Sequence, residues 1–63
     1  MIIWLTEVKT QNKVAINPKY IVGIFEIADE GEFKGCTAVS LINGSVIVEQ
    51  TPLYVADLIS QGD

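Results

Sequence analysis

The chain has 63 residues and a formal net charge of −4, with eight acidic residues, four lysines and neither arginine nor histidine. This length accommodates one domain and excludes a second. The acidic balance disfavours nucleic-acid binding, which depends on Lys and Arg at the phosphates, and the lack of histidine excludes proton transfer by an imidazole.

The first half of the chain predicts two strands joined as a hairpin. Residues 2–8 are rich in β-branched and aromatic side chains, and their continuous apolar start predicts a strand buried on both faces, in a central or an interface position. Residues 9–12 form a polar turn in which Asn12 can adopt a positive φ. Residues 13–17 alternate as a second strand, which Pro18 ends because proline cannot donate to a ladder. Residues 18–20 then form a turn or one 3₁₀ turn.

The middle of the chain predicts a third strand and a polar loop. Residues 21–28 form the strand, and Gly23 within it indicates a bulge or a close approach of another backbone. Residues 29–35 are the longest polar stretch and are typical of a loop.

An Asn43-Gly44 pair between two alternating runs predicts a β-hairpin with a two-residue type I′ turn. In that register Leu41 pairs with Val46, and Val39 pairs with Val48. These four side chains share the face expected to enter the core. The other face carries Ile42 and Ile47, which we interpret as a candidate association patch.

Thr51-Pro52 predicts the start of a C-terminal helix, because Thr51 can cap the free amides and Pro52 suits the first helical position. Val55, Leu58 and Ile59 form its apolar stripe, and Gly62 can close it. The expected fold is mainly β, with about five short antiparallel strands in a small sheet or barrel-like arrangement and one C-terminal α-helix. Residues 1–63 form a single small domain.

Hydrophobic residues make up 49% of the chain. A domain this small has too little interior to bury so many, and exposed apolar side chains mark contact sites. We therefore expect self-association as a homodimer or larger homo-oligomer, together with a protein partner that the sequence does not identify.

Cys36 is the only cysteine, so an internal disulfide is impossible. A small domain without disulfides is typical of a reducing compartment, and we expect a cytoplasmic protein. The apolar start is interrupted by Thr6 and Glu7, so neither a signal peptide nor membrane insertion is expected. Composition leaves open whether the chain is bacterial or phage-encoded.

Three groups of side chains are candidates for a chemical site. Asp29, Glu30 and Glu32 crowd one loop, where a solvated connection is favoured over a cation site. The strand carboxylates and the Cys36 thiol lack a histidine partner for acid–base or nucleophilic work, so we expect no enzyme. No cofactor motif is present, and we assign no catalytic, cofactor-binding or metal-binding residue.

The aromatic residues are better explained by packing and by partner contacts than by stacking on bases, since basic residues do not surround them. Phe25 lies in an apolar strand and is expected in the core, whereas Trp4 fits the core or an interface equally well. Phe33, in the acidic loop, and Tyr54, off the helix stripe, are expected to contact a partner. The predicted partner contacts are Trp4, Phe33, Ile42, Ile47 and Tyr54.

The chain resembles the FlbD-like family of small bacterial flagellar and swarming-motility proteins. The resemblance covers most of the chain and rests on these segments: Met1-Ile2, Leu5-Thr6, residues 16–21, residues 41–52 and residues 55–59. The chain departs from the family in its longer acidic connection, residues 28–35, and in being less basic. The resemblance implies a small cytoplasmic accessory protein of flagellar function, without catalysis.

A second comparison concerns architecture only. The carbon-storage-regulator family also packs five strands and a terminal helix, as an RNA-binding dimer, but this chain lacks that family's arginines. We therefore expect a non-catalytic, homo-oligomeric interaction or regulatory module, accessory to flagellar function. The alternative is a small regulator that binds RNA or single-stranded DNA.

Overall fold

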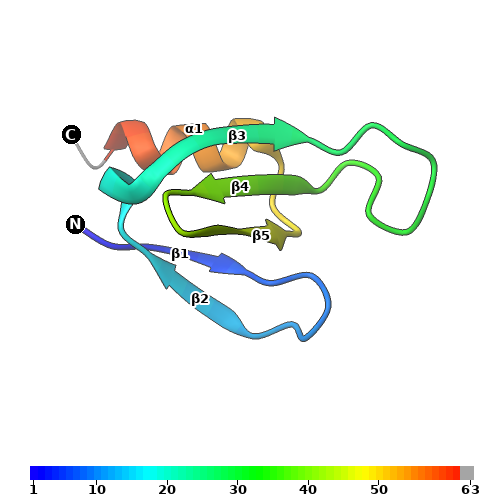
Figure 1. Cartoon of the computed structure of the whole chain (residues 1–63), viewed down its shortest axis with the longest axis horizontal. Helices are drawn as coiled ribbons and strands as arrows, with labels where there is room; N and C mark the ends of the chain where they lie inside the picture. Colours follow the sequence, from blue (N-terminus) through cyan, green and yellow to red (C-terminus); the bar gives the residue numbers. More distant parts are fainter. Residues whose placement is uncertain (62–63) are drawn as a thin grey trace.

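Across residues 1–61, which the computed structural model describes, five antiparallel strands form two small sheets, and one C-terminal α-helix follows (Figure 1). This confirms the predicted fold class. The elements are β1 (Ile3–Thr6), β2 (Lys13–Ile16), the 3₁₀ helix η1 (Pro18–Tyr20), β3 (Ile21–Glu26), β4 (Thr37–Leu41), β5 (Gly44–Val48) and α1 (Pro52–Gln61).

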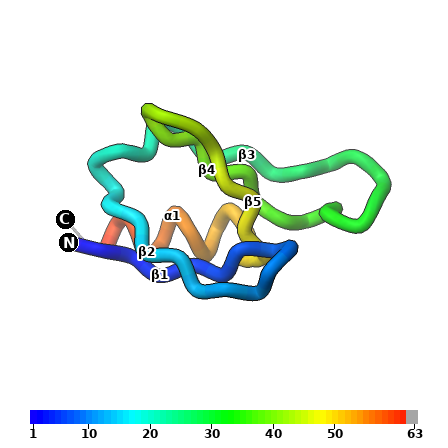
Figure 2. Tube along the Cα trace, turned by 60° about the horizontal axis from the view of Figure 1, so that its bottom comes forward, coloured from blue at the N-terminus to red at the C-terminus, as the bar shows by residue number. Residues whose placement is uncertain are grey.

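β1 and β2 form the predicted hairpin, and one of its faces packs against the core. Leu5 pairs with Val14, and Ile3 pairs with Ile16, and these side chains face the core. Trp4 lies on the opposite face and is 62% exposed, so the chain itself does not bury that face at Trp4, and burial of Trp4 in an interface stays a prediction. The chain leaves this face open because the three-stranded sheet and α1 lie on the same side of the hairpin (Figure 2).

The turn between β1 and β2 also differs from the expectation in one detail. Gln11, not Asn12, has a positive φ, of 62°. Its side-chain Nε2 donates to the Val8 carbonyl at 2.9 Å, and its N–H donates to the Glu7 carbonyl at 2.9 Å. These two bonds stabilise a conformation that glutamine seldom adopts.

β3 contains the bulge that Gly23 indicated. Ile21 pairs with Leu41 and Gly23 pairs with Ser40, so Val22 is an extra residue with no partner on β4. The insertion shifts the alternation of side chains, because it places both Val22 and Gly23 on the outer face. Ile21 and Ile24 can then both pack against the core, whereas Phe25 is turned outward.

The β4–β5 hairpin has its turn one residue earlier than predicted. Leu41 pairs with Gly44, which makes Ile42-Asn43 the two-residue loop, and Val39 pairs with Val46 rather than Val48. The type I′ prediction was wrong because neither Ile42 nor Asn43 has a positive φ. A hydrogen bond of 3.1 Å from the Ile42 N–H to the Tyr20 carbonyl holds the turn against η1.

The predicted faces of this hairpin survive the register error. The observed register differs by two residues, which is a full period of a strand, so no side chain changes face. Val39 and Val48 are fully buried, and Leu41 and Val46 pack against the core as expected.

The two sheets meet where β1 touches β5. Glu7 and Val48 form a single bridge, flanked by bonds of 3.0 Å from Val8 N–H to the Ile47 carbonyl and from Glu49 N–H to the Thr6 carbonyl. In the view of Figure 2, α1 lies between the β1–β2 hairpin and the three-stranded sheet. The core of buried hydrophobic side chains in the described residues consists of Ile3, Leu5, Ile16, Val39, Val48 and Val55.

α1 starts as the sequence predicts. The Thr51 hydroxyl accepts a hydrogen bond of 3.2 Å from the Tyr54 N–H, and Pro52 is the first helical residue. Val55 is fully buried, and Leu58 and Ile59 pack against the core. Gly62, which was expected to close the helix, lies outside the described residues.

A small polar cluster closes the core beside the start of α1. The Gln50 side chain accepts from the Thr6 N–H at 3.0 Å and donates to the Thr6 hydroxyl at 3.1 Å. The hydroxyl of Thr37, which is fully buried, donates to the Gln50 carbonyl at 2.6 Å. Buried polar groups require such partners, so this cluster ties β1 and β4 to the segment before the helix.

Candidate functional site

The Glu7 carboxylate is used within a turn. It accepts hydrogen bonds from the Thr10 hydroxyl at 2.7 Å, the Thr10 N–H at 2.9 Å and the Lys9 N–H at 3.1 Å. The hydrogen bonds from Thr10, and then that from Lys9, hold the pKa of Glu7 below its ordinary value. Bonds that favour the charged form make this carboxylate a poor proton carrier at neutral pH.

The other two strand carboxylates lie elsewhere on the surface. Glu26 is exposed at the end of β3, opposite Thr37, and Glu49 is exposed just after β5. Neither is among the residues 7–9 and 45–47 that line a hollow between β1 and β5. The carboxylates are therefore placed as separate surface groups.

The acidic loop between β3 and β4 does not gather its carboxylates around a point. The side chains of Asp29, Glu30 and Glu32 are exposed, and Glu30 forms an ion pair of 2.8 Å with Lys34. Within residues 1–61, no group of three potential metal-binding side chains comes together.

Cys36 closes the same loop and is half-buried. Its N–H donates to the Phe33 carbonyl at 3.0 Å, and its carbonyl accepts from the Ile27 N–H at 3.0 Å. These bonds place the residue at the base of the loop, directly before β4 begins at Thr37.

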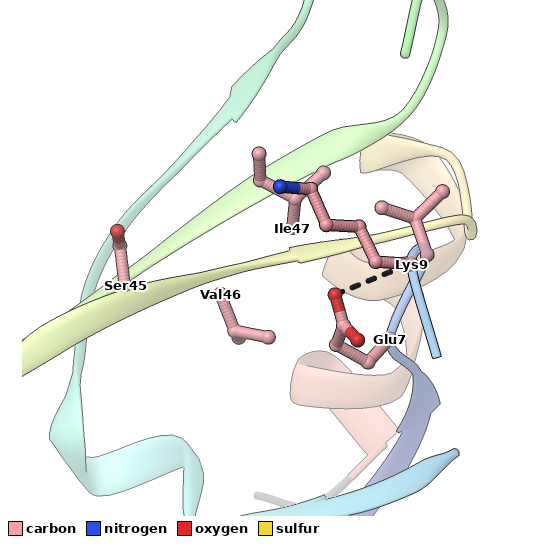
Figure 3. A pocket seen from close by; sticks show the side chains of 6 residues that line it. Glu7, Lys9, Ser45, Val46 and Ile47 are labelled. Carbon is pink, nitrogen blue, oxygen red and sulfur yellow. Dashed lines mark hydrogen bonds between the residues drawn. The ribbon is translucent and has the colours of Figure 1, made fainter. Parts of the chain in front are cut away.

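The depression drawn in Figure 3 lies where β1 separates from β5. It is an open hollow of about 400 Å³, lined by residues 7–9 and residues 45–47. Its polar side chains are those of Glu7, Lys9 and Ser45, and Glu7 is already engaged in the turn. A shallow hollow with one occupied carboxylate has no pair of groups for acid–base chemistry.

The predicted partner-contact residues lie on separate parts of the molecule. Trp4 projects from the hairpin, and Tyr54 is 51% exposed on α1. Ile42 is 66% exposed in the β4–β5 turn, whereas Ile47 is partly buried opposite Ala38 in the adjoining strand. Phe33 is partly buried, with the Lys9 ammonium 5.9 Å from the centre of its ring.

The position of Phe25 differs most clearly from the sequence prediction. It was expected in the core, yet it is 60% exposed on the outer face of the three-stranded sheet. Its ring lies over Gly23: a Cβ built on that glycine would come within 3.1 Å of the Phe25 ring. The bulge at Val22 is the physical reason, since it moves Phe25 from the inner face to the outer one.

The bulge creates a surface that sequence patterning missed. Four large apolar side chains are more than half exposed along and beside β3, and we call them the β3 strip: Tyr20, Val22, Phe25 and Ile42. The hydrogen bond between Ile42 and Tyr20 holds the turn and η1 together at one end of the strip. Alternation alone could not find it, because an unbulged strand would direct Val22 and Phe25 to opposite faces.

Among residues 1–61 no helix has the length and apolar character needed to cross a membrane. Comparisons with protein-family models, curated proteins and solved structures found no match to this chain. The candidate site therefore rests on the chain's own geometry, in which the exposed apolar β3 strip is the most prominent feature.

Proposed function

We propose that this chain is a non-catalytic interaction module that works as a homo-oligomer. One observation carries the proposal. In the described part of the chain, nine large hydrophobic side chains are 48–78% exposed, whereas six hydrophobic residues form the buried core. Apolar surface on this scale in a small domain is typical of a protein–protein interface.

The exposure does not come from loose packing. The radius of gyration is 10.9 Å, close to the roughly 10.6 Å expected for a folded chain of this length. The accessible surface of 4234 Å² is likewise near the roughly 4,000 Å² expected for this mass. The domain is as compact as a folded domain of this size normally is. The exposed apolar side chains are therefore available for contacts with other molecules.

The chemistry of the surface supports a role without catalysis. The hollow between β1 and β5 has one carboxylate, and that carboxylate is held by Thr10 and Lys9. Glu26, Glu49 and the acidic loop present separate, solvated charges. An enzyme needs a nucleophile or a proton carrier beside a second group that activates it.

Sedimentation equilibrium tests the proposal directly. The full chain is measured from about 1 µM to about 500 µM, a range that spans weak to moderate self-association. We expect the weight-average mass to rise with concentration, from near 6.9 kDa at the dilute end toward twice that value or beyond. A mass that stays at 6.9 kDa over the whole range would overturn self-association.

The assembly that this module serves is a separate part of the proposal. The resemblance to FlbD-like proteins makes the bacterial flagellar apparatus the first system to examine. Deleting the gene in its host and scoring swarming on soft agar tests this point. Normal motility of the deletion strain would remove the flagellar assignment and leave self-association untouched.

A further inference from the structure

β1 and β5 are also edge strands, but they meet each other around Glu7 and Val48. The strand edges without such a contact within residues 1–61 are the outer edge of β2 and the outer edge of β3. An unpaired edge is a template for another strand unless charge or proline protects it. β2 is four residues long, carries Lys13 and is followed closely by Pro18. β3 is six residues long and has no charged side chain before Glu26, so it is the less protected edge.

The backbone of β3 offers regular hydrogen-bonding groups at this edge. Ile27 donates its N–H to the Cys36 carbonyl on the β4 side. Since backbone groups alternate in direction along an antiparallel strand, Phe25 and Gly23 also face β4. The N–H and C=O groups of Ile24 and Glu26 therefore point to the open edge.

The β3 strip adds apolar contacts beside these backbone groups. Val22 is 66% exposed and lies next to Gly23, over which the Phe25 ring is folded. A bulge can blunt a sheet edge, but this bulge brings Val22 and Phe25 onto one face and so widens the apolar surface. A partner that pairs with the edge covers this surface as well.

Charge at the two ends of β3 selects a second copy of the chain as that partner. Lys19 precedes the strand and Glu26 ends it, both are exposed, and within residues 1–61 neither forms an ion pair. A two-fold contact joins the same patch on both subunits, so it must be complementary to itself. When two β3 strands lie antiparallel, Lys19 of each copy comes near Glu26 of the other.

We propose that two copies of this chain pair antiparallel through the outer edges of their β3 strands, centred on Val22-Gly23, to form a continuous six-stranded sheet. This interface deepens the self-association proposed above and rests on it. The exposed ring of each aromatic residue in the β3 strip, Tyr20 and Phe25, can bury on the order of 100 Å² of surface. With the other strip residues and the strand backbone of both copies, pairing buries on the order of 1,000 Å², which corresponds to a weak dimer with a micromolar Kd.

The first test compares two single substitutions by sedimentation equilibrium. Val22→Lys places a charge beside the two-fold axis and is expected to raise the dimer Kd at least tenfold. Leu53→Lys makes the same change in charge on α1, where Leu53 is 78% exposed, and is expected to leave the Kd within about twofold. Circular dichroism of both variants is the control that checks whether each keeps the fold.

A charge swap tests the antiparallel arrangement independently. Lys19→Glu and Glu26→Lys each bring like charges together across the interface, so each is expected to weaken the dimer several-fold. The double variant restores opposite charges, keeps the net charge of −4 and is expected to recover the original Kd. Recovery in the double variant distinguishes pairing across the axis from an effect of net charge.

The outcomes separate this proposal from the one that it rests on. If the wild-type chain and the Val22→Lys variant dimerise with the same Kd, the β3 interface is overturned and self-association still stands. Dissociation by Leu53→Lys alone would also overturn it, because the interface would then lie on α1. A wild-type chain that is monomeric at every concentration overturns both proposals.

Discussion

At the scale of single residues, Gln50 is the clearest structural contributor outside the hydrophobic core. Its side chain binds both the N–H and the hydroxyl of Thr6, and its carbonyl accepts from Thr37. Thr6 is only 4% exposed, so its amide has little access to water. The sequence offers no pattern that would identify Gln50, because its partners lie 44 and 13 positions away.

Gln50→Ala should lower the free energy of unfolding by about 1–3 kcal/mol, since it leaves the buried Thr6 amide without a partner. Urea denaturation at one fixed protein concentration measures the change, because the proposed self-association would make stability depend on concentration. Gln61→Ala, at the exposed end of α1, is the matched control and should stay within about 0.5 kcal/mol of wild type. Equal losses in the two variants would contradict the role of Gln50.

Glu7 makes stability depend on pH in acid. Its pKa is held below the ordinary 4.5 by hydrogen bonds from Thr10 and Lys9. A carboxyl whose pKa is lowered by folding stabilises the folded state above its unfolded pKa, and that contribution disappears as pH falls through the folded-state pKa.

Glu7→Gln should therefore be less stable than wild type at about pH 6, and the difference should shrink at about pH 3 and below. Urea denaturation of both proteins at each pH measures the free energy of unfolding. A difference that is constant with pH, or that grows in acid, would show that the charge of Glu7 does not stabilise the turn.

At the scale of elements, the β4–β5 hairpin shows how tertiary contacts override a turn preference. The Asn43-Gly44 pair correctly predicts a two-residue loop, but the loop occupies Ile42-Asn43. The bond from Ile42 to Tyr20 depends on η1, which lies about twenty residues earlier and has no part in local turn chemistry. Alternation still assigned every core side chain of the hairpin to the correct face, because the error was one full period.

The loop between β3 and β4 depends on one glycine for its closure. Gly35 has a φ of +86°, a left-handed conformation that disfavours a Cβ, and its N–H donates to the Ile27 carbonyl at 2.9 Å. Gly35→Ala should therefore destabilise the protein by about 1–2 kcal/mol. The cost is conformational, since a Cβ there would meet no atom within 4 Å.

Gly31→Ala in the same loop is the matched control. Its Cβ would also meet no atom within 4 Å, and its φ lies outside the left-handed region. We expect this variant to unfold within about 0.5 kcal/mol of wild type in urea. If both alanine variants unfold alike, backbone strain at Gly35 does not control the loop.

At the scale of the whole molecule, composition and periodicity predicted the fold class, the strand order along the chain and the helix with its cap. They did so because a small domain buries one face of each element, and the period of the apolar residues identifies that face. The period wrongly placed Phe25 in the core, because the bulge interrupts the alternation of side chains between Ile21 and Ile24. The exposure of the β3 strip on the outer face of the sheet follows from this interruption.

The charge distribution predicts that the chain does not retain nucleic acid. Lys9, Lys13 and Lys19 lie in the first turn, β2 and η1, and Lys34 is paired with Glu30. Filter binding with single-stranded RNA and DNA at about 20 mM salt should show no retention, because binding at low salt depends on clustered cations. Saturable binding that weakens steeply with salt would favour the alternative of a nucleic-acid-binding regulator.

Hydrogen exchange of individual backbone amides tests the central claim, that copies of this chain meet through β3. NMR follows the amides of Ile24 and Glu26 from dilute to concentrated protein. The amides of Lys13 and Ala15 are the internal control, because Asn12 bonds to Glu7 on the β1 side and alternation then directs these two amides to the open edge of β2. We predict that exchange at Ile24 and Glu26 slows as the concentration rises, while exchange at Lys13 and Ala15 does not change. Exchange at Ile24 and Glu26 that is independent of concentration would contradict the account.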